Sequence, residues 1–223
     1  MLFIHHENTE IQSSCLEGIL QVVTKQSDLL ESAGFRDQSF IERIFYLCRQ
    51  QQEATRYLIF ILFQHLLKKN IEYNDSFFIN LCNLTTLYIA RFVCNARIEA
   101  ISLISYAFPN QYFVGYTWDN QNPQESPLFK LITTFIDNFA LFSLKEKKEA
   151  AFAVANFGFF VRIETVQYFF ANTTILEIFL SLLALDQEEI IQPLLDGFYR
   201  VLQLSEKQML SDDQKTELQQ CLN

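Results

Sequence analysis

Glycine and proline are scarce in this chain, with 5 and 4 copies among 223 residues. Short strands joined by tight turns need these residues, so their scarcity argues against a β-sandwich or β-barrel. Phenylalanine, in contrast, occurs 23 times, and half of the chain is hydrophobic. A chain of this length and composition can bury a sizeable core in one or two domains. The composition therefore favours a helical protein.

Long hydrophobic runs are also missing. The run Leu58 to Phe63 is among the longest, and it falls far short of the roughly 20 residues that a membrane span needs. The first residues, Met1 to Glu7, lack a basic region followed by an apolar stretch, so they do not have the pattern of a secretory signal. We therefore expect a soluble protein with no membrane partner.

Positive charge is in short supply, with 17 basic against 26 acidic residues and a formal net charge of −9. Nonspecific nucleic-acid binding relies on Lys and Arg that neutralise phosphates, so we expect no nucleic-acid partner. A basic protein or peptide partner fits this balance, although solubility alone also requires net charge. The densest basic cluster, Lys145, Lys147 and Lys148, is interleaved with Glu146 and Glu149.

Motifs that carry catalysis or bind metals are absent from the sequence. It contains no glycine-rich phosphate loop, no nucleophile elbow and no HExxH motif. The adjacent pair His5 and His6 lacks the spacing of a metal-binding helix face, and His65 lies in an apolar segment. The five cysteines form no CxxC pair and indicate reduced thiols. We expect no cofactor, no metal and no enzymatic activity.

Apolar residues recur with helical periodicity in successive, mostly paired segments. These segments are 11–31; 38–49 with 52–68; 75–92 with 96–107; 128–142 with 146–160; and 164–171, 174–185 and 188–204. Such pairs repeat at roughly 35–50 residues, which is typical of HEAT or armadillo repeats. We predict an all-α, right-handed armadillo/HEAT-like α-solenoid of about five degenerate repeats, with a compact irregular helical bundle as the alternative. Residues 1–206 would form one domain, and 207–223 a polar tail or terminal helix.

Two segments interrupt this pattern. Residues 109–127, which contain Pro109, Gly115 and Trp118, are predicted to be a loop. Pro193 implies that the last helix starts near Gln192 or kinks there. Gly197 would then lie inside that helix, where a small residue allows close helix packing.

The most informative stretch is 148–156, in which Phe152 and Asn156 are separated by four residues. Side chains at this spacing project from one helix face. An exposed ring can support a long cationic side chain, and an amide can bind peptide backbone groups. The alternative is that Phe152 belongs to the core and Asn156 is a solvated helix residue.

Lys148-Glu149-Ala150-Ala151-Phe152-x-x-x-Asn156 resembles the KEAAWxxxN signature of the armadillo repeats of importin alpha. The resemblance continues through Gln167-Tyr168-Phe169, Leu182-Leu183 and Asp186 to Ile190-Ile191-Gln192-x-x-Leu195-Asp196-Gly197. It covers residues 146–206 well and extends weakly to 96–145. In this weaker region, five residues resemble residues of the following repeat at one constant distance along the sequence: Arg97, Glu99, Ala100, Ile104 and Ser105.

Importin alpha binds Lys/Arg-rich nuclear localisation signals in a groove lined by the third helix of each repeat. The resemblance implies that Phe152 takes the tryptophan position, Asn156 the asparagine position and Glu149 the acidic position. Ser105, in the echo, is a fourth candidate peptide-binding residue. The partners implied are basic peptide or protein cargo and other transport factors, and the location implied is cytoplasm and nucleus.

The sequence departs from the family pattern in the preceding repeat, where Ser102 and Tyr106 stand at the expected tryptophan and asparagine positions. The beginning of the chain also lacks a basic importin-beta-binding segment. These departures keep a second hypothesis open, in which the chain is an armadillo-like interaction scaffold that has lost signal-peptide binding.

Overall fold

The structure is a computed structural model that describes residues 8–25, 33–49, 53–69, 72–91, 96–185 and 187–206. Within these ranges the chain is all-helical and contains no strand, which confirms the predicted all-α class. The α-helices are α1 (Thr9–Lys25), α2 (Ala33–Arg36), α3 (Gln38–Arg49), α4 (Glu53–Lys68), α5 (Asp75–Ile89), α6 (Ala96–Ala107), α7 (Gln111–Thr117), α8 (Pro127–Asn138), α9 (Leu144–Phe160), α10 (Ile163–Asn172), α11 (Ile175–Leu183) and α12 (Glu188–Glu206). Two 3₁₀ turns, η3 (Pro123–Glu125) and η4 (Phe139–Leu141), flank α8.

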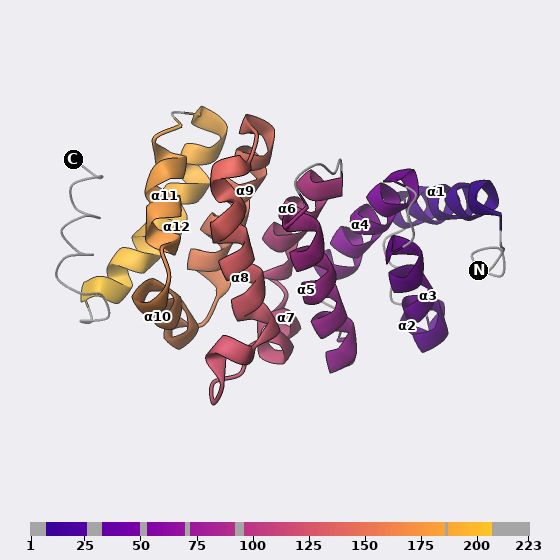
Figure 1. Cartoon of the computed structure of the whole chain (residues 1–223), viewed down its shortest axis with the longest axis horizontal. Coiled ribbons are helices and arrows are strands. Elements are labelled where there is room, and N and C mark those ends of the chain that lie inside the picture. Colours follow the sequence, from indigo (N-terminus) through magenta and orange to yellow (C-terminus); the bar gives the residue numbers. More distant parts are fainter. Residues whose placement is uncertain are drawn as a thin grey trace.

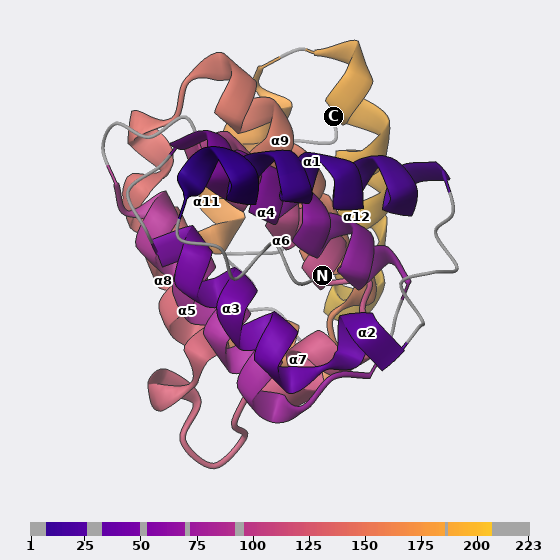
Figure 2. The ribbon, with the colours of Figure 1, turned by 90° about the vertical axis from the view of Figure 1, so that its right-hand side faces the viewer.

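The helices succeed one another along the long axis of the molecule, from α1 at one end to α12 at the other (Figure 1). One layer, which we call the long-helix layer, consists of α1, α4, α6, α9 and α12, and each of these helices packs on the next. The end view in Figure 2 shows α3, α5 and α8 beside this layer. Helices α4, α6, α9 and α12 begin 43, 48 and 44 residues apart, within the predicted repeat period. This arrangement is compatible with an α-solenoid.

Local capping explains where several helices begin. The Asn74 side chain accepts a hydrogen bond from the Phe77 amide at the start of α5. Ser126 caps α8, and Pro127 occupies the first turn, where its missing N–H costs nothing. Ser143 and Glu146 form a reciprocal capping box at the start of α9.

Phenylalanine side chains join neighbouring helices in a continuous core. Phe45 of α3 packs on Phe63 of α4 with ring centroids 5.0 Å apart. Phe179 of α11 meets Phe198 of α12 edge to face at 4.7 Å. Each pair links two successive helices, so the apolar face of one helix is buried by the next, as in a stacked-repeat protein.

The prediction of a loop over 109–127 is wrong in its first half, because residues 111–117 form α7. Asn110 caps this helix by accepting hydrogen bonds from the amides of Tyr112 and Phe113. Gly115 lies in the helix, is exposed and does not break it. The Pro109-Asn110 pair therefore ends one helix and starts another, whereas we interpreted it as the beginning of a loop.

Helix α12 begins at Glu188 and contains Pro193, so a helix start near Gln192 is wrong. Gly197, in contrast, lies at a close crossing of α12 with α9, as its size suggested. A Cβ at Gly197 would lie 2.9 Å from the carbonyl oxygen of Ala155 and 3.0 Å from its Cα. Gly158 faces the same point, where a Cβ would lie 3.1 Å from the Gly197 carbonyl oxygen. Only small residues allow the two backbones to approach this closely.

Several predictions fall outside the described residues: those for 26–31, the His5-His6 pair, Asp186 and the tail 207–223. Among the described helices, none alone is long and apolar enough to cross a membrane. The pair α10 and α11 passes such a test together, by length and composition only, with a bend of 91° between them.

We predict that Gly197→Ala lowers the free energy of unfolding by about 1–3 kcal/mol, because the added methyl group overpacks the crossing with α9. Helix propensity alone predicts the opposite sign, a gain of about 1 kcal/mol. The matched control is Gly18→Ala in α1, where nothing lies within 4 Å of the added Cβ. Urea denaturation of both variants measures the difference, and a Gly197→Ala protein as stable as Gly18→Ala would contradict the close crossing.

Candidate functional site

Glu149, Phe152 and Asn156 lie along one accessible side of α9, and all three side chains are half-buried. The opposite side of the helix, including Ala153 and Phe157, is buried in the core. Phe152 packs against that core while part of its ring stays accessible. The stripe therefore belongs to the face of the long-helix layer that its neighbours do not cover, and the ring is neither sealed inside nor fully exposed.

Asn156 also has a structural partner. Its Nδ2 donates a hydrogen bond of 2.7 Å to the backbone carbonyl of Ser105 in α6. That carbonyl would normally accept from the N–H four residues later, but this residue is Pro109, which has no N–H. Asn156 thus supplies the hydrogen bond that the end of α6 lacks. Its Oδ1 has no partner among the described residues, so this atom can accept a hydrogen bond from a bound peptide.

The Ser105 side chain is buried, with 6% of its surface exposed, and its hydroxyl donates to the Ser102 carbonyl. A peptide on the surface would not reach this hydroxyl. Ser105 therefore contributes to the site through its carbonyl, which positions Asn156, and we no longer expect a direct peptide contact from its side chain.

Two carboxylates from adjacent helices face the same region. Burial raises the pKa of Glu99 in α6, and the nearby Glu149 carboxylate raises it further. A hydrogen bond from Gln64 and the charge of Lys145 act in the opposite direction. A cation bound near both carboxylates would oppose this effect, because an adjacent positive charge favours the charged form of Glu99.

An ion pair between Arg97 and Glu146, buried at the junction of α6 and α9, holds this arrangement in register. Arg97 Nη2 donates to Glu146 Oε2 at 2.9 Å, and its Nε donates to Oε1. Glu146 also accepts from the Ser143 amide at 2.7 Å and from the Ser143 hydroxyl at 2.8 Å. In the sequence, Glu146 was identified only as an acidic residue interleaved with Lys145, Lys147 and Lys148. The Ser-x-x-Glu spacing of a capping box was the signal that could have identified its role.

A second connection links α9 to α12, where Lys148 Nζ lies 3.1 Å from Glu189 Oε2. This pair is partly exposed, so its contribution to stability is small. It nevertheless places an acidic side chain of α12 beside the stripe of α9 and neutralises Lys148, which would otherwise repel a basic peptide.

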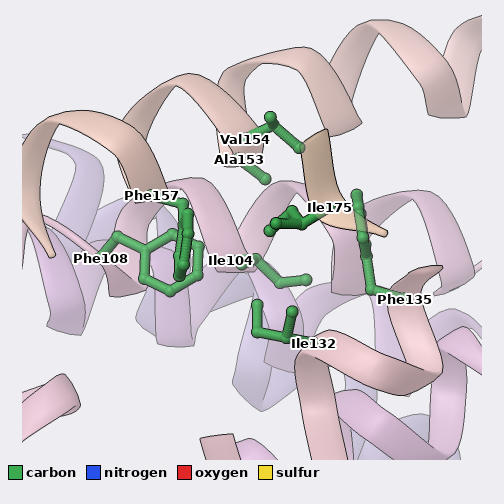
Figure 3. A pocket seen from close by; sticks show the side chains of 8 residues that line it. All are labelled: Ile104, Phe108, Ile132, Phe135, Ala153, Val154, Phe157 and Ile175. Carbon is green, nitrogen blue, oxygen red and sulfur yellow. The ribbon is translucent and has the colours of Figure 1, made fainter. Parts of the chain in front are cut away.

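The core beneath the stripe holds a small apolar cavity of about 10 Å³ between α6, α8, α9 and α11. Figure 3 shows its lining, which includes Ile104, Phe108, Ala153 and Phe157. Ligand pockets have volumes of roughly 300–1,000 Å³, so this cavity is a packing defect and not a binding site. Among the described residues, no group of three or more His, Cys, Asp or Glu side chains could hold a metal ion.

Trp118, whose role the sequence did not reveal, lies at the end of α7 and packs against Tyr168 and Phe169 of α10. Its indole N–H donates to Asn120 at 2.8 Å. The ring borders an open cleft of about 520 Å³ that Arg162 and Glu164 also line. Trp118 therefore stabilises the contact between two neighbouring helical units, and it is not part of the stripe on α9.

Comparison with known proteins supports the fold alone. No family model matches the chain, and no curated protein matches it. The chain is similar to the crystal structure of an engineered protein, with a TM-score of 0.57 and 11% identity over 99% of this chain and 92% of that one. At this identity, the similarity shows a shared helical architecture and carries no information about function.

We predict that Glu146→Gln lowers the free energy of unfolding by about 3 kcal/mol at pH 7, because Arg97 loses its buried charge partner. Burial alone would raise the pKa of Glu146, but the hydrogen bonds from Arg97 and Ser143 and the Arg97 charge outweigh burial and lower it. The stabilisation from a carboxyl with a lowered pKa is complete above its unfolded-state pKa, about 4.3, and disappears as the pH falls through the folded-state pKa.

The stability gap between the wild type and Glu146→Gln should therefore close between about pH 4.3 and the lower folded-state pKa. Urea titrations at several pH values measure this gap, with the exposed Glu177→Gln as the control that should change little at any pH. A gap that stays constant down to pH 3 would show that the ion pair does not hold α6 against α9.

Proposed function

We propose that the protein is an importin-alpha-like adaptor, which binds basic peptides of the nuclear localisation signal type for protein import into the nucleus. The fold would then be a right-handed armadillo-type solenoid of about five degenerate repeats. The helix order supports this proposal, because α7, α8 and α9, and then α10, α11 and α12, are successive groups of three helices. In each group the third helix is the longest and belongs to the long-helix layer.

The observation that carries the proposal is the accessible stripe of Glu149, Phe152 and Asn156 on α9 beside Glu99 on α6. A lysine or arginine of the peptide would place its aliphatic chain or its charged group against the Phe152 ring, with the charged group near the carboxylates of Glu99 and Glu149. Asn156 Oδ1 would accept a hydrogen bond from the peptide backbone.

The expected affinity is low. A cation over an aromatic ring contributes roughly 0.5–2 kcal/mol, and phenylalanine is a weaker platform than tryptophan. Half-burial of Phe152 and Glu149 restricts access further. Tight binding would require several such contacts on one peptide, or a second transport factor that binds the same complex. Under this proposal the protein acts in the cytoplasm and the nucleus.

We predict that a labelled Lys/Arg-rich peptide binds the wild-type protein and that binding weakens as salt is raised, because the attraction is largely electrostatic. The double variant Glu149→Gln, Phe152→Leu should weaken binding by about 10-fold, since both the charge and the ring are lost. Glu149→Gln keeps the size of the side chain, and Phe152→Leu keeps an apolar side chain against the core, so α9 should stay folded. Fluorescence anisotropy measures the titration.

The control for charge alone is Glu177→Gln on α11, which removes one exposed carboxylate outside the long-helix layer. Its affinity should stay within about twofold of the wild type, because exposed charges act weakly at a distance. Absence of binding by the wild type, or equal binding by the double variant, would rule out the adaptor function.

A scaffold that has lost signal-peptide binding is the second candidate. The preceding repeat has Ser102 and Tyr106 where the family has tryptophan and asparagine. The layer also exposes large aromatic side chains at Phe159, Phe160 and Tyr199, the last with 65% of its surface accessible. Exposed aromatic clusters favour apolar protein partners. Affinity capture that returns partners without a basic motif would support this alternative, and enrichment of nuclear cargo would contradict it.

A further inference from the structure

Tyr106 of α6, which replaces the expected asparagine, already has a cation on its ring. The ammonium nitrogen of Lys68, the last residue of α4, lies 4.3 Å from the centre of the Tyr106 ring. This distance is well inside the roughly 6 Å over which a ring attracts a cation. Lys68 is exposed, and no carboxylate lies within 4 Å of its ammonium among the described residues.

The position of Tyr106 connects this contact to the candidate site. Tyr106 directly follows Ser105, whose carbonyl binds Asn156 of α9. Its ring is half-buried on the same side of α6 as Glu99 and Ser102, at helical spacings of seven and four residues. Tyr106 therefore extends the stripe of α9 onto the neighbouring helix.

A similar contact involves Phe159, seven residues after Phe152 on α9. The guanidinium carbon of Arg200 in α12 is 5.9 Å from the centre of the Phe159 ring. Among the described residues, no such contact involves Phe152. Tyr106 and Phe159 thus each have a cation of the chain itself near the ring, whereas Phe152 has none among the described residues.

We propose that Tyr106 is a second binding site for the cationic side chain of a peptide and that Lys68 is its internal occupant. A peptide residue can use this ring only after Lys68 has been displaced, so the chain restricts basic peptides to the Phe152 site. The ligand class is a primary ammonium or guanidinium group, and Lys68 itself displays the binding geometry. The peptide role rests on the proposed function, while the Lys68–Tyr106 contact stands without it.

Lys68→Met tests the proposal, because it keeps the length of the side chain and removes the charge. A labelled peptide with four lysines should bind this variant about threefold more tightly than the wild type, the size expected for one exposed cation–ring contact. Lys130→Met is the matched control, since Lys130 is exposed on α8, outside the long-helix layer. It removes the same charge and should change affinity by less than about 1.5-fold, because exposed charges at a distance are screened by salt.

The background variant Tyr106→Leu separates ring binding from charge repulsion. The double variant Tyr106→Leu, Lys68→Met should bind the peptide no more tightly than the double variant Tyr106→Leu, Lys130→Met. A gain that persists without the ring would overturn the proposal, as would equal affinities of Lys68→Met and Lys130→Met in the native background. A second measurement follows the side-chain NMR signals of Lys68. Ring currents should shift its ε protons upfield in the wild type, and saturating peptide should not remove this shift.

The outcomes distinguish this inference from the proposed function. If the wild type binds through Phe152 and Glu149 but Lys68→Met binds no better, the second site is wrong and the adaptor function stands. If the wild type does not bind and Lys68→Met binds in a manner that depends on Tyr106, the second site is correct and the adaptor function is wrong. If no variant binds, both are wrong.

Discussion

The buried pair of Arg97 and Glu146 is the constraint on which the rest of the candidate site depends. Two opposite charges removed from water at the junction of α6 and α9 must stay together, because either one alone would be costly to bury. The carboxylate also belongs to the capping box at the start of α9, so the first turn of that helix is tied to α6. With this end held, the accessible side of α9 follows from helix geometry, and Glu149 and Asn156 come to lie opposite Glu99 and Ser105.

The junction of α9 with α12 uses the opposite chemistry. There the backbones approach closely because Gly158 and Gly197 have no side chains, and none of the described side chains at this contact is a buried charge. One neighbour of α9 is therefore specified by an ion pair and the other by the absence of a Cβ. Together the two junctions determine which side of α9 remains open, and that open side holds Glu149, Phe152 and Asn156.

Much of the helical order could be predicted from the sequence, because apolar periodicity and capping residues are local signals. The expected segments 38–49 and 96–107 coincide with α3 and α6. Gly197 was also interpreted correctly as a site of close packing. The error at 109–127 arose because Pro109 and Gly115 suggested a loop, whereas Asn110 caps a short helix there. The partners of Asn156 and Glu146 were missed because both lie about 50 residues away in the sequence, beyond the reach of any local pattern.

By itself, the sequence determined an all-helical chain with a repeating order, since scarce turn residues and regular apolar spacing leave few other solutions. It also determined that Glu149, Phe152 and Asn156 share one side of a helix, because a period of 3.6 residues dictates this. Only the tertiary structure decided that this side is partly accessible, that Asn156 completes the end of α6, and that Lys68 lies on Tyr106. These features depend on how separate helices pack, and packing is set by contacts between residues distant in the chain.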